Sequence, residues 1–174
     1  TDDNVLRQTT ARLPWLLIGM IGGIGNSMIL GNFDSTFAAH PEMALYIPLI
    51  GGTGGNVGTQ SSAIVVQGLA NSSLDAKNTF KQVTKEAVVA LINATIISLL
   101  VYTYNFIRFG ATATVTYSVS ISLFAVVMFA SIFGTLVPMT LEKLKIDPAI
   151  ATGPFIAITN DIIGMMLYMG ITVL

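Results

Sequence analysis

Five long segments without a charged side chain restrict the fold of this chain more than any other feature. Each can cross a bilayer core once, which takes about 17–25 residues of helix, and none comfortably crosses twice. The segments are continuously apolar rather than alternating, which argues against transmembrane strands. An all-α membrane protein is therefore predicted, with five transmembrane helices in one bundle. The segments are residues 13–33, 43–74, 87–107, 109–141 and 148–160, and the last continues past Asp161 to the C-terminus.

The composition agrees with a membrane protein and excludes several function classes. Hydrophobic residues make up 53% of the chain and charged residues 10%, whereas soluble domains carry about 25% charged residues. No run of Lys or Arg indicates a nucleic-acid partner. The chain has no cysteine, which excludes disulfides and thiolate sites, and its one histidine, His40, rules out a multi-His site within one protomer. The expected surroundings are a lipid bilayer.

The basic residues predict the orientation. With five crossings, the N-terminus and two of the loops share one side of the membrane, and this side carries seven of the eight Lys and Arg residues. Positive residues stay cytoplasmic, so we expect the N-terminus inside and the C-terminus outside, in the plasma (inner) membrane. The seven are Arg7, Arg12, Lys77, Lys81, Lys85, Lys143 and Lys145, and the eighth is Arg108.

Asp161 is the only acidic or basic residue in the last 27 positions and lies at their midpoint. A carboxylate at the centre of a transmembrane helix costs about 2.5–3.5 kcal/mol on insertion scales. Such a group is retained where it faces water, protein or a cation. Asp161 is thus the first candidate for a functional residue. The alternative is a structural Asp held by Asn or Thr partners.

The second segment has five glycines in the eight residues from Gly51. One interpretation is close helix packing, because Gly51 with Gly55, and Gly54 with Gly58, form pairs of small residues four apart. The other is a helix partly unwound beside a pore, with backbone carbonyls exposed to an ion. The two interpretations remain equally supported by the sequence.

Polar and helix-breaking residues mark two further places. Asn56, Gln60 and Gln67 lie on one helical stripe, which favours a wet or buried lining over lipid contact. In the last segment, Asp147-Pro148 suits a helix start, and Gly153-Pro154 then interrupts the helix because Pro154 lacks an N–H donor. Two Gly/Pro-interrupted helices of opposite direction point, weakly, to a site near the midplane.

Two motifs carry a resemblance to a known family. The run Pro48-Leu-Ile-Gly-Gly-Thr-Gly-Gly-Asn-Val-Gly-Thr-Gln-Ser61 and the later run from Asp147 to Asp161 resemble the MgtE family of magnesium channels. The resemblance implies a homodimer whose second and fifth helices line a pore on the dimer axis. It implies that Asp161 binds hydrated Mg²⁺ with the main-chain carbonyl of Ala157, and that the pore is lined by Asn56, Thr59, Gln60, Gly153 and Asn160.

The resemblance also bears on domain organisation. We expect residues 1–174 to be one transmembrane domain, taken from a longer protein whose cytoplasmic N-terminal regulatory region is absent from it. Relatives often carry such regions, including CBS domains that sense Mg²⁺. The sequence departs from the family pattern at Ala63 and Gly153, which offer no side-chain oxygen. Backbone, water or the amides of Asn56 and Asn160 would then complete the ion's surroundings.

The chemistry of the residues points the same way. Mg²⁺ uses one or two carboxylates and keeps several waters, and one Asp161 from each protomer of a dimer supplies two carboxylates. Oxygen donors also suit Mn²⁺ and Ca²⁺, and transported Co²⁺ is a further possibility. The sequence therefore predicts a divalent-cation channel or transporter for Mg²⁺, and not an enzyme.

Two alternatives use the same carboxylate. A proton- or Na⁺-coupled divalent-cation carrier would employ Asp161 as its relay. An intramembrane aspartyl protease needs two carboxylates that share a proton, which only a dimer of this chain could supply through Asp161 of each protomer.

Overall fold

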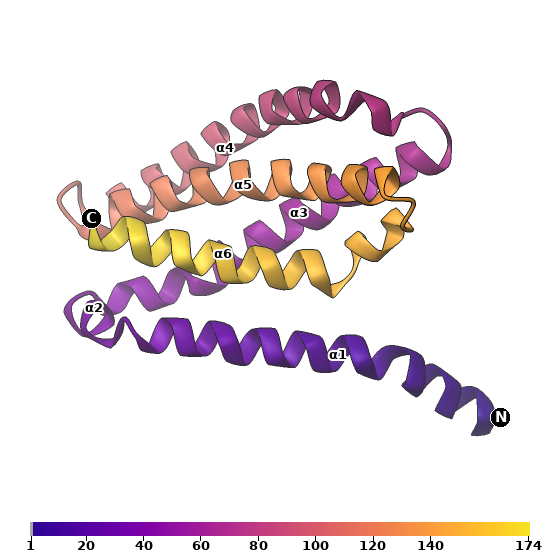
Figure 1. Ribbon diagram of the computed structural model, residues 1–174. Coiled ribbons are helices and arrows are strands. Elements are labelled where there is room, and N and C mark those ends of the chain that lie inside the picture. Colours follow the sequence, from indigo (N-terminus) through magenta and orange to yellow (C-terminus); the bar gives the residue numbers. More distant parts are fainter. Residues whose placement is uncertain (1) are drawn as a thin grey trace.

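The computed structural model describes residues 2–174, with side chains for residues 4–150 and 153–174. Within them the chain forms helices and turns and no strand, so the prediction of an all-α fold is confirmed. The helices are α1 (Asp2–Gly31), α2 (Asp34–Ala39), α3 (Ile47–Ala70), α4 (Thr79–Phe109), α5 (Thr114–Lys143) and α6 (Pro154–Val173), with 3₁₀ turns η1 (Pro41–Tyr46), η2 (Ala76–Asn78) and η3 (Pro148–Thr152) (Figure 1).

Five of these helices are long, in agreement with the five segments expected. Four of them are both long and apolar enough to cross a membrane, in the ranges Asn4–Gly31, Ala76–Phe109, Thr114–Lys143 and Pro154–Val173. The fifth, α3, is 24 residues long and carries no charged residue, but its glycines, amides and hydroxyls lower its hydropathy. The architecture is that of a multi-pass membrane protein.

Helix α5 forms the centre of the bundle, and α1 lies at its edge. α5 packs against α3, α4 and α6, and 56% of its apolar span is buried. α1 packs along α6, and none of its apolar span is buried (Figure 1). A helix with such an exposed apolar surface is suited to lipid or to a partner chain.

A cluster of buried hydrophobic side chains closes one end of the bundle. η1 contributes Met43 and Tyr46, which pack against Leu123 of α5 and Met169 of α6. The Tyr168 hydroxyl donates a hydrogen bond of 2.9 Å to the Met43 carbonyl, and the Tyr46 hydroxyl donates to Asn105 Oδ1. These bonds satisfy buried polar groups and fix the start of α3 against α4 and α6.

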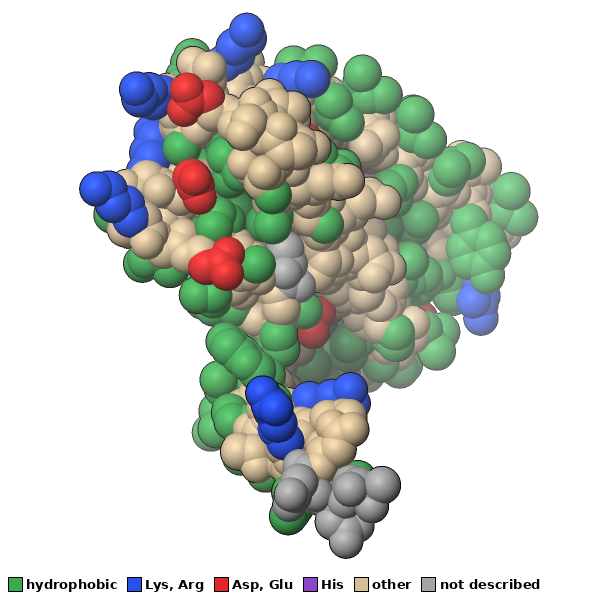
Figure 2. Space-filling model, turned by 90° about the vertical axis from the view of Figure 1, so that its right-hand side faces the viewer, with side chains coloured by type: hydrophobic (Ala, Val, Ile, Leu, Met, Phe, Trp, Pro, Cys, Tyr) green, Lys and Arg blue, Asp and Glu red, His purple; other side chains and the backbone are tan. Residues whose placement is uncertain are grey.

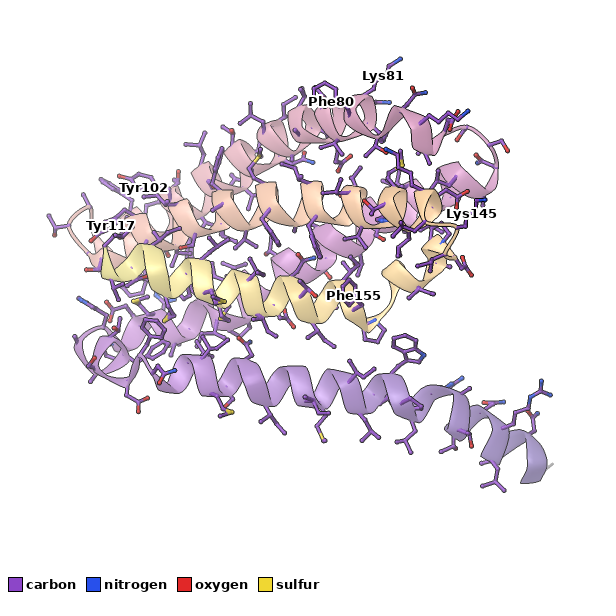
Figure 3. The ribbon with its side chains drawn as sticks, viewed as in Figure 1. Phe80, Lys81, Tyr102, Tyr117, Lys145 and Phe155 are labelled. Carbon is purple, nitrogen blue, oxygen red and sulfur yellow. The ribbon has the colours of Figure 1, made fainter. Side chains whose placement is uncertain are left out.

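The two ends of the bundle differ in charge. The N-terminus and the α3–α4 and α5–α6 connections lie at the same end (Figure 1). Lys and Arg side chains gather on the face seen at that end (Figure 2), and Lys81 and Lys145 both lie there. Tyr102 and Tyr117 lie at the opposite end (Figure 3). This segregation is the one on which the predicted orientation depends, and the orientation itself stays a prediction.

The two expected helix breaks have different outcomes. Gly153, with φ −93° and ψ −156°, separates η3 from α6, and Pro154 begins α6, so the break at Gly153-Pro154 is confirmed. The Asp147 side chain caps η3 by accepting from the Ala149 amide at 3.0 Å. Of the two interpretations of the second segment, partial unwinding is wrong, because α3 is continuous from Ile47 to Ala70 across its glycine run.

Candidate ion site

Asp161 lies near the middle of α6, beside the glycine run of α3. Its Oδ1 atom is 3.1 Å from the position that a Cβ atom on Gly51 would occupy. The carboxyl group therefore rests against the bare backbone of α3, and any side chain at position 51 would crowd it. Glycine at this position lets the two helices approach while the carboxylate stays between them.

The surroundings of Asp161 leave its charge without a protein partner. Within the described residues, no hydrogen bond or ion pair to its carboxylate is found, and the ion pair that does occur joins His40 and Glu42 at 3.9 Å, elsewhere in the fold. A structural Asp held by Asn or Thr would require such bonds. The same residues contain no group of three or more His, Cys, Asp or Glu side chains that could hold a metal ion. A cation at Asp161 would meet one carboxylate per protomer.

Two predicted site residues precede Asp161 in the chain. Ala157 is one turn earlier and half-buried, and its carbonyl retains a second lone pair beside the one used by the helix. Gly153 lies at the start of α6, where it lines a groove of about 390 Å³ with Trp15 and Asp147. Eight residues, or about 12 Å of helix rise, separate Gly153 from Asp161. Gly153 is thus at the entrance to the helix rather than beside the carboxylate.

Asn160 is next to Asp161 but points into the protein. Its side chain is 1% exposed, and neither of its amide atoms has a hydrogen-bond partner among the described residues. A Cβ atom on Gly58 would collide with this amide, and one on Gly54 would lie 3.6 Å from the Asn160 carbonyl oxygen. The structure therefore places the Asn160 side chain in the α3–α6 contact, and its role in lining a pore stays a prediction.

The predicted pore residues of α3 have different surroundings. Thr59 donates its hydroxyl to the Gly55 carbonyl at 2.8 Å, and Asn56 is exposed. Gln60 is nine residues from Gly51, about 180° around the helix at 100° per residue, so it does not share a face with Asp161. It lines a groove of about 340 Å³ between α3 and α4, together with Ser61 and Glu86.

The glycines of α3 divide into a packed and an open set. A Cβ atom on Gly54 would lie 2.9 Å from Val126 Cγ1, and one on Gly134 of α5 would lie 2.5 Å from the Gly58 carbonyl oxygen. Gly52 and Gly55 have nothing within 4 Å of their Cβ positions. Some glycines therefore permit close packing, as the first interpretation proposed, and others leave a face of the helix bare; that this face lines a pore stays a prediction.

Asn26 of α1 is a further candidate that the sequence analysis missed. It lines a cavity of about 60 Å³ between α1 and α6 that also contains Asp161. Its signal in the sequence was its spacing from Gly19, Gly22 and Gly23, which places all four on one helical face. An isolated amide on an apolar helix does not reveal its partner, because the partner lies on a distant helix.

Comparison with known proteins identifies the family. The model of the MgtE family, described as divalent cation transporter, matches residues 47–171. The magnesium transporter MgtE of Bacillus subtilis (strain 168) is 33% identical over 160 residues, which cover 92% of this chain and 35% of that protein. The Thermus thermophilus magnesium transporter MgtE is 32% identical over 161 residues, with the same coverage of 92% and 35%.

A third relative is more distant but aligns over more of the chain. The Enterococcus faecalis magnesium transporter MgtE is 28% identical over 169 residues, covering 97% of this chain and 37% of that protein. The chain thus spans about a third of the length of these relatives. Because the family model matches well over half of its residues, the chain belongs to the MgtE family of divalent cation transporters.

Proposed function

We propose that this chain forms the membrane pore of a divalent-cation channel or transporter that moves hydrated Mg²⁺, with Asp161 as the central ion site. The observation that carries the proposal is the Asp161 carboxylate, which lies midway along an apolar helix, against bare α3 backbone, and without a bond to a described residue. A carboxylate in such a place is best stabilised by a cation or by water. The three relatives are each named as magnesium transporters, which favours Mg²⁺ as the substrate.

The proposed pore lies on the axis of a homodimer and is lined by α3 and α6. Support comes from the open face of α3, where Gly52 and Gly55 have no neighbour within 4 Å and Asn56 is exposed. A two-fold axis beside this face would bring two Asp161 carboxylates together. Two carboxylates match what Mg²⁺ generally takes from proteins. Helix α1, whose apolar surface is exposed in the protomer, supplies further area for a partner or for lipid.

The ion is proposed to keep most of its water shell. Mg²⁺ requires near-octahedral oxygen coordination at about 2.0–2.1 Å, and the Ala157 carbonyl and Asp161 offer too few protein ligands for a dehydrated ion. Each carboxylate would contact coordinated water, which places its oxygens roughly 4 Å from the metal. Such a site selects ions by the size and charge of the hydrated form, and Mn²⁺, Co²⁺ and Ca²⁺ are the competitors to test.

The test is divalent-ion flux into liposomes that contain the purified chain. Asp161→Asn keeps the shape of the side chain and removes its charge, so we expect flux of ²⁸Mg²⁺ to fall at least about 100-fold, the effect of losing about 2.7 kcal/mol of charge stabilisation. Size-exclusion chromatography should show the same oligomer as the wild type. Unchanged flux in a well-folded Asp161→Asn protein would contradict the assignment.

Two additions to this assay separate the mechanisms. Cobalt hexammine, which mimics the hydrated ion and does not exchange its ligands, should compete with Mg²⁺ in the wild type and lose its effect in Asp161→Asn. A proton- or Na⁺-coupled carrier would instead show Mg²⁺ flux that requires an H⁺ or Na⁺ gradient. Competition without such a requirement supports the hydrated-ion channel, and the reverse result supports the carrier.

A further inference from the structure

Helix α1 packs closely against α6 near Asp161. A Cβ atom on Gly22 would collide with the side chain of Ile158, which is one turn before Asp161. Gly19 and Gly23 flank this contact and have no neighbour within 4 Å of their Cβ positions. The absence of side chains leaves room between the two helices at the level of the carboxylate.

The space forms a small polar chamber. It has a volume of about 60 Å³ and is lined by Gly19, Gly22, Gly23, Asn26, Ile158 and Asp161. A water molecule occupies about 30 Å³ in the liquid, so the chamber holds one or two waters or the edge of a hydrated ion. Its functional groups are one amide and one carboxylate, on opposite helices.

The amide oxygen of Asn26 has no donor among the described residues. Its Oδ1 atom is buried and accepts no hydrogen bond, and no hydrogen bond or ion pair to Asp161 is found in the same residues. Neither oxygen donates, so the two cannot bond to each other directly, and no hydrogen bond from the Asn26 Nδ2 group to Asp161 is found in the described residues either. A buried acceptor normally finds a donor in protein or in water. The donor that suits both groups is water, and most of all water polarised by a cation.

We propose that Asn26 is a positioning residue of the ion site: its amide oxygen accepts a hydrogen bond from the water shell of the cation at Asp161, so that α1 forms a third wall of the site beside α3 and α6. This inference rests on the proposed function of Asp161. An amide oxygen favours the donors that coordinated waters present, and it adds no charge that would pull water off the metal. Asn26 thereby holds the hydrated form of the ion and has no contact with the metal itself.

The test compares two substitutions of the same shape. Asn26→Thr retains an oxygen that accepts hydrogen bonds, whereas Asn26→Val replaces it with a methyl group. Mg²⁺ and, separately, cobalt hexammine are titrated into the purified protein, with equilibrium dialysis as the measurement. We expect Asn26→Val to weaken binding of both ions about tenfold, as for one lost hydrogen bond to a charged group, and Asn26→Thr to stay within about threefold of the wild type.

Two further variants complete the experiment. Asn26→Asp, which keeps the shape and adds an acceptor charge, should bind both ions more tightly, and this result stands even if Asn26→Val does not fold. Asn32→Val, in the turn after α1 and outside the chamber, should change nothing. Equal weakening in Asn26→Val and Asn26→Thr, or none in either, would overturn the role of Asn26. If the wild type binds no Mg²⁺, or if Asp161→Asn binds as the wild type does, the proposed function itself fails.

Discussion

Two faces of α3 carry the same residue type and have opposite surroundings. On one face, Gly54 and Gly58 lie where a single methyl group would strike Val126 or Asn160. On the other, Gly52 and Gly55 have no atom within 4 Å of their Cβ positions. Glycine on the packed face lets helices approach closely. Glycine on the open face contributes nothing to the packing of the protomer, and its lower helix propensity weakens α3. The comparison suggests that the first set serves the fold and the second serves the path of the ion.

The largest expected effect is the loss of folded protein when the packed face is filled. In Gly58→Val the new side chain would meet the Asn160 amide, with Ile156 Cγ2 3.0 Å from its Cβ. Overpacking of this kind costs about 1–3 kcal/mol and more where backbone must move. We expect a fall of about 3 kcal/mol in the free energy of unfolding, measured by denaturant titration in detergent.

A companion substitution tests the same contact from α5. Gly134→Ala adds one methyl group 2.5 Å from the carbonyl oxygen of Gly58, which is backbone and cannot rotate away. Gly52→Ala is the control on the open face, and it should be neutral or slightly stabilising because Ala is the better helix former. Equal stability of Gly134→Ala and Gly52→Ala would remove the distinction between the two faces.

The next effect is on transport rather than on folding. Gly55→Val places a branched side chain on the open face, which we propose lines the pore. We expect ²⁸Mg²⁺ flux in liposomes to fall at least tenfold, while the free energy of unfolding changes by about 0.5 kcal/mol or less, as for surface substitutions. The matched variant is Gly58→Val, in which we expect loss of folding stability rather than a specific loss of flux. A folded Gly55→Val protein with full flux would show that this face does not border the ion path.

This difference between faces also explains what the sequence could reveal. The uncharged segments predicted the long helices, because charged residues are excluded from membrane spans and this exclusion appears in the sequence as a continuous run of uncharged residues. The break at Gly153-Pro154 was predictable because the missing donor of Pro154 is a property of that residue. Unwinding of α3, one of the two interpretations of its glycines, was wrong because the helical cost of glycine is offset by contacts with α5 and α6, and such contacts are not local in sequence. Nor could spacing alone show which glycine meets a neighbour.

The candidate ion site, like the fold, could be predicted only in part from the sequence. Asp161 was identified from its isolation among apolar residues, which requires no knowledge of the fold. Asn160, its neighbour, is also predicted to line the pore, and the sequence did not reveal that its amide is buried against Gly58 in the protomer. Adjacent residues on a helix differ by about 100° in direction, so only the helix packing decides which of them faces a path. Asn26 was missed for the same reason, because its chamber is formed by two helices far apart in the chain.

The smallest expected effect concerns a third face of α3, toward α4. The Ser61 hydroxyl donates a hydrogen bond of 2.7 Å to Glu86 Oε1, and this bond joins the two helices across the groove that Gln60 lines. Interhelical hydrogen bonds in membrane proteins contribute about 0.6 kcal/mol on average.

Ser61→Ala should lower the free energy of unfolding by about that amount and leave Mg²⁺ flux unchanged, because the groove lies away from Asp161. Ser62→Ala is the matched control: the Ser62 hydroxyl is buried without a partner, so its removal should be neutral or stabilising. If both substitutions lower stability equally, the Ser61–Glu86 bond has no role in holding α3 to α4. If Ser61→Ala reduces flux, the groove belongs to the ion path, and the assignment of transport to the open glycine face must be extended to it.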